Sequence, residues 1–364
     1  MSEPLPDEGW SREVILLKNA VICPPTATVL RPPCGVYSAD GDCLNASLWR
    51  GGVRMTVGGS PDTIPTAKIS GRHMWGGLFY GHFGHFMTET MSRCWAFDRD
   101  DIESVIFVPK HGKLKDFQAY RLDYWKLLGL TADINVAHEA IEVEELLVPG
   151  QGFGLGKIAR GTPEYRETMR KLTARVPDDE PRKIYISRTK FFGRGGVLAE
   201  QALEENFTRN GYTVINPERM PLVDQLRFYK SATHIIGVDS SAFHIAGMVA
   251  NPSQEYAFIL RRDNNAYDSI ALQIEGMTGK TPHIIDALAA NWMEEAQIKS
   301  NHLSWGELDH EVLARKLQEI GFIQGAGTWE PPSKELMDSS IDYANTRSLT
   351  EGLVRKPIER LNDA

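Results

Sequence analysis

The chain has 364 residues, of which 42% are hydrophobic, and a formal net charge of −8. This length suffices for two domains that each bury a core. The acidic balance argues against a general nucleic-acid binder, because surfaces that follow a phosphate backbone are basic. No run approaches the roughly 20 apolar residues of a membrane-spanning helix, and residues 1–8 are acidic and proline-containing, unlike a secretion signal. We therefore expect a cytoplasmic protein.

The four cysteines give no sign of a metal site. Cys23, Cys34, Cys43 and Cys94 form no CxxC pair and no zinc-finger spacing. Because no secretion signal is visible, reduced thiols are expected, and a disulfide from Cys23 to Cys34 or Cys43 is the minority alternative.

Residues 1–176 are expected to form a first domain. Up to about residue 75 the chain is β-rich and loop-rich, with strand candidates at 14–17, 26–30 and 53–57. Glycines and aromatic residues at 76–81 predict a flexible loop, and a helical pattern follows from about His82 or Gly84. From residue 104 strands alternate with helices, in a βαβ rhythm that ends in a helix at 163–176.

Residues 177–181, Pro-Asp-Asp-Glu-Pro, are the predicted linker. Beyond it, strands alternate cleanly with helices, which predicts a parallel sheet with right-handed crossovers and a ligand at the carboxyl ends of its strands. The predicted strands are 183–187, 213–215, 234–238 and 256–260. The fold class is therefore α/β, with a second domain at 182–320. Residues 321–364 form a C-terminal tail that is predicted to be helical around 338–361. Packing of this tail against the first domain is one open alternative.

The run 233–250 predicts a strand, a turn and a helix. Small hydroxyl residues, Ser240 and Ser241, stand at the predicted helix start, where unpaired N–H groups and the helix dipole favour an anion such as phosphate. A merely capped helix explains the same run equally well.

Four titratable residues share one stripe of the helix predicted after residue 82. His82, His85, Glu89 and Arg93 fall on one face at 100° per residue. One interpretation is a structural network in which Glu89 binds Arg93. A second is a metal site from His82, His85 and Glu89, although the spacing departs from HExxH. The third is acid/base or substrate-binding work in a cleft, where a carboxylate or neutral imidazole takes a proton from a hydroxyl.

A basic, glycine-rich stretch follows the first strand of the second domain. Arg188 and Arg194 lie in it, at a strand end where such sheets bind ligands, and their guanidinium groups suit a diphosphate. A solvated basic loop is the alternative. Glu218, after the next strand, is placed like an acid that holds a ribose hydroxyl.

Several sequence blocks lie together over roughly residues 75–260. They are residues 85–96 (His-Phe-Met-Thr-Glu-Thr-Met-Ser-Arg-Cys-Trp-Ala), Ile186-Ser187-Arg188 with Arg194, Glu200 and Gly211, residues 214–218 (Val-Ile-Asn-Pro-Glu), Leu222 with Gln225, and Ile236-Gly237 to His244. In combination these blocks resemble glycosyltransferase family 61, formerly described through a domain of unknown function in capsular polysaccharide biosynthesis proteins.

The resemblance implies a GT-B architecture, with two Rossmann-like domains that face each other across a cleft. It further implies inverting transfer of a sugar from a nucleotide donor, expected to be UDP-linked, to a glycan or lipid-linked glycan acceptor. The implied process is cell-surface polysaccharide synthesis. No obligatory metal or other cofactor is expected. In that picture the second domain binds the donor and the first domain provides the acceptor side and the base.

The resemblance also implies roles for individual residues. The implied base is Glu89 or His85, with His82 and Arg93 on the acceptor side or in support. The donor and its phosphates are assigned to Arg188, Arg194, Glu218, Asp239, Ser240, Ser241 and His244.

One departure concerns Asp239. Family members commonly carry a Gly-x-His-Gly-Ala turn where this chain has Gly-Val-Asp-Ser-Ser-Ala at 237–242. An aspartate there repels a diphosphate unless it is directed to a ribose, a sugar hydroxyl or an arginine.

Two other functions stay open. One is a metal-dependent hydrolase that uses His82, His85 and Glu89. The other is a catalytically silent sugar-nucleotide-binding partner of another transferase. The expected location is the cytoplasm, with peripheral association at the inner face of the membrane left open, and the oligomeric state is not predicted.

Overall fold

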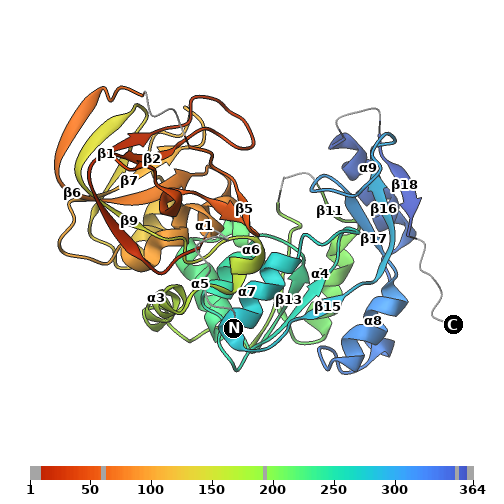
Figure 1. Ribbon diagram of the computed structural model, residues 1–364. Coiled ribbons are helices and arrows are strands. Elements are labelled where there is room, and N and C mark those ends of the chain that lie inside the picture. Colours follow the sequence, from red (N-terminus) through yellow and green to blue (C-terminus); the bar gives the residue numbers. More distant parts are fainter. Residues whose placement is uncertain (1–9, 59–62, 192–194, 349–351, 359–364) are drawn as a thin grey trace. The chain divides into compact units, whose positions relative to one another are not determined.

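The computed structural model describes residues 10–58, 63–191, 195–348 and 352–358 (Figure 1). The chain divides into two units, Met1–Val176 with Gly247–Val249, and Pro177–Ala246 with Ala250–Ala364. Within the described residues, no helix is both long and apolar enough to cross a membrane. All four cysteines are free thiols.

The first unit is built on a seven-stranded mixed sheet with the order β3-β2-β1-β9-β6-β7-β8. β1 pairs antiparallel with β2 and β9, whereas β6 pairs parallel with β9 and β7. The sheet strands are β1 (Val14–Cys23), β2 (Gly35–Ser38), β3 (Gly41–Asp42), β6 (Ala67–Phe79), β7 (Ser104–Pro109), β8 (Asp133–Val136) and β9 (Ile141–Pro149).

Short elements surround this sheet. β4 (Trp49–Arg50) and β5 (Val53–Arg54) form a separate two-stranded ladder. The helices are α1 (Phe83–Thr88), α2 (Tyr120–Leu127) and α3 (Pro163–Ala174), with 3-10 turns η2 (Leu44–Ala46), η3 (Thr90–Ala96) and η4 (Gly156–Arg160). Apolar side chains of the central strands, such as Val36, Trp75 and Val143, form the core.

β6 corrects the prediction of a flexible loop at 76–81, because Gly76 and Gly77 lie at the buried end of this central strand, which continues to Phe79. The β6–β7 register shifts between Trp75 and Gly77, which marks a bulge. A Cβ on Gly76 would meet the ring of Phe107 at 2.5 Å, and Gly77 has φ +101°. Glycine is therefore required here by close packing and backbone conformation, not by flexibility.

The predicted continuous helix after residue 82 is also wrong, since α1 ends at Thr88 and the tighter η3 follows. The side chain of Thr90 explains the break. Its hydroxyl donates to the carbonyl of Leu78 at 3.0 Å and accepts from the N–H of Tyr80 at 2.9 Å, which ties the chain to the end of β6. The stripe at 100° per residue therefore does not continue to Arg93.

The second unit contains a five-stranded parallel sheet with the order β12-β10-β13-β14-β15. This confirms the predicted α/β class and the parallel sheet. The strands are β10 (Lys183–Ile186), β12 (Thr213–Ile215), β13 (His234–Val238), β14 (Glu255–Ile259) and β15 (His283–Ile285), and the helices between them are α4 (Glu200–Arg209), α5 (Leu222–Ser231), α6 (Ala242–Met248) and α7 (Asp268–Thr278), with a 3-10 turn η5 (Pro217–Arg219) after β12.

The strand order reverses direction beside β10. The chain passes from β10 outward to β12, and then continues on the other side of β10 with β13. Open parallel sheets bind ligands at such a reversal, beyond the carboxyl ends of the strands. The residues that follow β10, β13 and β14 therefore lie where a ligand is expected.

A second, four-stranded sheet with the order β11-β17-β16-β18 completes this unit. Its strands are β11 (Gly196–Val197), β16 (Leu288–Met293), β17 (Trp305–Leu308) and β18 (Val354–Pro357), and α8 (His310–Glu319), η6 (Ala326–Thr328) and α9 (Lys334–Thr346) accompany it (Figure 1). β18 pairs antiparallel with β16. The described part of the predicted tail 321–364 is assigned to the second unit, and it ends in a strand where a helix was expected.

Candidate functional site

The first candidate site surrounds Glu89, which follows α1. The side chain of Glu89 is 0% exposed. Arg50 of β4 donates from Nε to Oε1 at 2.5 Å and from Nη2 to Oε2 at 2.7 Å. His85, one turn earlier on α1, places Nδ1 2.6 Å from Oε2. Burial raises the pKa of Glu89, but the hydrogen bonds from His85 and Arg50 and the charge of Arg50 outweigh it and lower that pKa below its usual value. The carboxylate is therefore ionised at neutral pH.

His85 is the accessible member of this group, with 36% of its side chain exposed. An ionised carboxylate only accepts hydrogen bonds, so the imidazole must carry its proton on Nδ1. In the neutral ring the lone pair then lies on Nε2, which becomes the basic atom. The Tyr80 ring packs 5.1 Å from the imidazole and also lies under the Arg50 guanidinium, 5.9 Å away. We call Arg50, Tyr80, His85 and Glu89 the Glu89 cluster.

Arg93 does not pair with Glu89, which corrects the network expected from the helical stripe. Its buried guanidinium donates to main-chain carbonyls, from Nε to Pro149 at 3.0 Å and from Nη2 to Asn45 at 3.2 Å and Ser47 at 2.7 Å. Burial lowers its pKa to about 10, so it remains charged at neutral pH. Arg93 therefore joins η2 to the end of β9.

His82 is exposed at the N-cap of α1, and its ring lies 5.5 Å from that of His85. Among the described residues, no group of three or more His, Cys, Asp or Glu side chains has an arrangement that could hold a metal ion. Glu89 already binds Arg50 and His85 with both carboxylate oxygens.

The second candidate site lies at the strand reversal of the parallel sheet. Arg188 follows β10, Asp239 and Ser240 follow β13, and Arg261 and Arg262 follow β14. We call these five residues the Asp239 cluster. The three strands are neighbours and parallel, so their carboxyl ends lie together.

Polar atoms without hydrogen bonds gather in the Asp239 cluster. Among the described residues, three buried atoms of the cluster have no hydrogen-bond partner: Nε of Arg188, Oγ of Ser240 and Nη1 of Arg261. The carboxylate oxygens of Asp239 and Nε of Arg262 have ion pairs within the cluster but no hydrogen bond of good geometry. Buried polar groups are nearly always paired, because an unpaired one costs about 1–3 kcal/mol. So many at one sheet edge indicate a place prepared for a polar ligand.

The carboxylate of Asp239 points to an arginine. A ribose and a sugar hydroxyl were the other two partners that the sequence left open for it. Arg261 Nε lies 2.8 Å from Oδ1 and donates to the main-chain carbonyl of Asp239 at 2.9 Å, while Arg262 Nε lies 3.7 Å from Oδ2. Burial raises the pKa of Asp239, although the charges of Arg261, Arg262 and Arg188 oppose this shift. With three arginines around one carboxylate, the net charge of the cluster is positive.

Arg188 is partly anchored, because Nη2 donates to the carbonyl of Gly195 at 3.3 Å and the guanidinium lies 4.7 Å from the ring centre of Phe191. Burial and the charge of Arg261 lower its pKa to about 10, so it is protonated at neutral pH. Exposed Glu218 also acts electrostatically on Arg188. Arg194 lies outside the described residues.

The remaining predicted donor residues lie on or just before α6. The carbonyls of Ser240 and Ser241 accept the first N–H groups of the helix, from Phe243 and His244, at 3.1 Å each. His244 is buried, with Nδ1 2.8 Å from Oε1 of Gln273 on α7. In the described structure it thus takes part in a contact between two helices.

Sequence reasoning missed Arg50, Arg261 and Arg262. Arg261 and Arg262 could have been found from the sequence, because each is a basic residue directly beyond a predicted parallel strand, as Arg188 is. Arg50 carried no such signal, because nothing in the sequence relates it to a glutamate 39 positions away.

The fold and these groups define an α/β protein with a cluster of buried charged residues at the strand reversal of a parallel sheet. Residues 83–254 match the family model Glycosyltransferase 61, which confirms the resemblance to glycosyltransferase family 61. The matched segment includes His85, Glu89, Arg188 and Asp239, but ends before Arg261. No curated protein matches the chain.

Proposed function

We propose that the chain is an inverting glycosyltransferase that moves a sugar from a nucleotide donor, with UDP as the expected nucleotide, to a hydroxyl of a glycan acceptor. The family match supports a glycosyltransferase. The observation that carries the donor assignment is the group of unpaired guanidinium and hydroxyl atoms in the Asp239 cluster. Proposed with it are a GT-B arrangement of the two units, a cytoplasmic location and a role in cell-surface polysaccharide synthesis.

A diphosphate suits the Asp239 cluster better than a neutral ligand does. Guanidinium groups bind phosphate oxygens with two parallel hydrogen bonds, and Nε of Arg188 and Nη1 of Arg261 have no partner among the described residues. In a site shielded from water, these fixed charges also stabilise the negative charge that develops on a departing diphosphate. Asp239 then keeps the arginines together while the site is empty.

The Glu89 cluster suits the acceptor side. In the proposed step the acceptor oxygen bonds to the anomeric carbon, the bond from that carbon to the diphosphate oxygen breaks, and the acceptor proton passes to Nε2 of His85. Glu89 holds the imidazole in the required tautomer and stabilises its cationic form, and Arg50 holds Glu89. The geometry thus favours His85 as the base and Glu89 as a positioning residue, and it requires no metal for the proton transfer.

Donor binding is tested by the thermal shift that UDP produces. A ligand that binds only the folded state raises the melting temperature. We expect UDP to raise that of the wild type and to lose this effect in Arg188→Ala and Arg262→Ala. The matched control is Arg227→Ala on α5, because the half-buried side chain of Arg227 pairs with Asp179 and Glu180 and not with the cluster. An unchanged UDP shift in both cluster variants would remove these arginines from the donor site.

The chemical step is tested by mass spectrometry of products after a screen of nucleotide sugars and acceptors. We expect His85→Ala to lose transfer and to keep the UDP shift, and Glu89→Gln to keep a weaker activity whose pH profile is displaced. Turnover should persist after treatment with a chelator. Full activity of His85→Ala would refute its role as base. UDP binding with neither transfer nor slow donor hydrolysis would favour the silent-partner alternative.

A further inference from the structure

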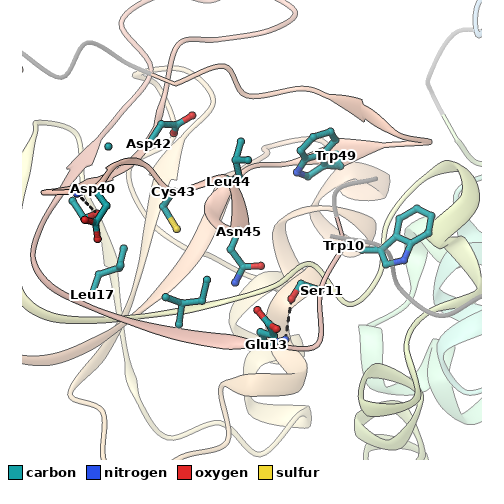
Figure 2. Close-up of a pocket in the computed structure, with 13 residues that line it drawn as sticks. Trp10, Ser11, Glu13, Leu17, Asp40, Asp42, Cys43, Leu44, Asn45 and Trp49 are labelled. Atoms are coloured by element: carbon teal, nitrogen blue, oxygen red, sulfur yellow. Dashed lines mark hydrogen bonds between the residues drawn. The ribbon is translucent and has the colours of Figure 1, made fainter. Parts of the chain in front are cut away.

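A cavity of about 520 Å³ lies in the first unit, and none of the residues of the Glu89 cluster lines it (Figure 2). Its volume falls in the range of about 300–1,000 Å³ typical of small-molecule sites. The residues that line it are Trp10, Ser11, Glu13, Ile15, Leu17, Ser38, Asp40, Gly41, Asp42, Cys43, Leu44, Asn45 and Trp49.

The walls combine aromatic surface with hydrogen-bond acceptors. Figure 2 shows Trp10 and Trp49 at one end, Asp40 and Asp42 toward the other, and Glu13 between them. An indole ring packs against the C–H face of a sugar, and carboxylates accept hydrogen bonds from sugar hydroxyls. The described lining carries three carboxylates and no lysine or arginine, so it favours a neutral or cationic ligand over an acidic one.

The acidic residues of the wall differ in what they offer a ligand. Asp42 pairs through Oδ2 with Arg54, and its Oδ1 is closed off from solvent beside Gly35. Asp40 is exposed and is therefore the carboxylate better placed to accept hydrogen bonds from a ligand.

The wall is held in place before any ligand binds. Gln151, 1% exposed, accepts from the N–H of Trp49 at 2.9 Å and donates to its carbonyl at 3.1 Å. Asn45 donates from Nδ2 to the carbonyl of Val148 at 2.8 Å, and its own carbonyl accepts from Arg93. A wall fixed in this way loses little freedom when it binds a ligand, which favours affinity.

The cavity adjoins the Glu89 cluster through one strand. Trp49 lines the cavity, and its neighbour Arg50 in β4 binds Glu89. Successive side chains of a strand point to opposite faces, so the cavity and the Glu89 cluster use opposite faces of β4. A ligand here is therefore placed beside the proposed base but apart from the reacting hydroxyl.

We infer that this cavity binds a neutral or amino-substituted sugar residue of the glycan acceptor, apart from the residue that receives the new sugar. Its identification as part of the acceptor rests on the proposed function, whereas its sugar-binding property stands on the cavity alone. Binding of a remote residue would help to position the acceptor, since binding energy from non-reacting parts of a substrate can be used for orientation.

Saturation-transfer NMR on the full chain tests the sugar-binding property. The probes are the methyl glycosides of glucose, galactose, glucosamine and glucuronic acid at millimolar concentration. We expect signals from the first three and a much weaker signal from the glucuronide. The Trp49→Ala variant should give no such signals. The Trp49→Phe variant should give weaker signals than the wild type, because phenylalanine keeps an aromatic face. Trp292→Phe, in the second unit, is the control and should match the wild type.

Asp40→Asn tests the charge preference, because Asp40 is exposed and lines the cavity. It should weaken the glucosamine signal more than the glucose signal. The inference is overturned if no glycoside binds, or if Trp49→Ala binds all of them like the wild type.

Binding of UDP separates a failure of this inference from a failure of the proposed function. We expect the UDP shift to be unchanged in Trp49→Ala and Asp40→Asn. Glycoside binding without a UDP shift in the wild type would refute the proposed function and the acceptor assignment, and would leave a sugar-binding cavity. A UDP shift without glycoside binding would refute the cavity alone.

Discussion

Glu89 shows what spacing in a sequence can and cannot reveal about a site. His85 and Glu89 are four positions apart on a helix, so their contact could be predicted from the sequence. Arg93 is also four positions from Glu89, but the change to a 3-10 turn directs it to carbonyls instead. The partner that Glu89 does bind, Arg50, comes from a distant ladder and could be found only from the fold.

Replacing Arg50 by alanine should destabilise the first unit. The change leaves Glu89 as a buried carboxylate with one of its two partners removed, which costs about 3 kcal/mol of unfolding free energy by analogy with other broken buried pairs. Chemical denaturation measures it. As a control, Arg72→Ala removes an arginine whose ion pairs with Glu145 and Asp101 are screened by solvent, so the change should cost much less stability. Equal losses in the two variants would contradict this account of Arg50.

Among the elements, the parallel sheet was the most predictable. Its strands alternate with helices of amphipathic pattern, and the predicted strands at 213–215 and 234–238 agree with β12 and β13. In the first unit, predictions from short stretches of sequence were partly wrong. No strand forms at 26–30, and the glycines of β6 signal a loop in sequence although they fill a bulge in the centre of a sheet. The partners that make a glycine necessary, such as Phe107, are not visible in the local sequence.

The junction between β10 and α4 should make stability depend on pH. Glu200 is buried there and accepts hydrogen bonds from the N–H of Arg188 at 2.8 Å and from the hydroxyl of Tyr185 at 3.0 Å. Burial raises its pKa to about 7. The folded state therefore binds more protons than the unfolded state between the ordinary glutamate pKa of about 4.3 and about 7, and stability falls as pH rises through this interval.

Glu200→Gln should flatten this part of the stability profile. Removing the titration removes a decline on the order of 3 kcal/mol between these pH values, while the amide oxygen can still accept a hydrogen bond. Denaturation across that pH range measures the slope. Glu205→Gln, at an exposed position of the same helix, should leave the wild-type slope unchanged, and a Glu200→Gln profile as steep as the wild type would disprove the assignment.

For the whole molecule, length and composition sufficed to predict more than one core, and two large clusters of buried apolar residues are present. They could not predict that the first unit takes residues from two separate stretches of chain. Gly247–Val249 belong to it, although the residues on either side belong to the second unit. In particular, the hydroxyl of buried Tyr124 lies 3.1 Å from the sulfur of Met248.

A fragment that ends at residue 176 should therefore be less stable than the same unit in the full chain. Without Met248, Tyr124 loses a core neighbour, and the cavity left by a missing methionine side chain costs about 2–5 kcal/mol. A peptide of residues 240–252, added in trans, should raise the melting temperature of the fragment, and the same peptide with Met248→Ala should raise it less. A fragment that melts identically with and without the peptide would show that these residues contribute nothing.

This interrupted boundary also affects the order of events during synthesis. Domains usually fold in turn from the N-terminus as the chain emerges. Here the first unit is complete only once residue 249 has left the ribosome, and by then β10, β12 and β13 of the second unit have emerged as well. Completion of the first unit therefore waits until part of the second unit has been synthesised, so a pause in translation just before codon 247 would hold the first unit without its last core residues.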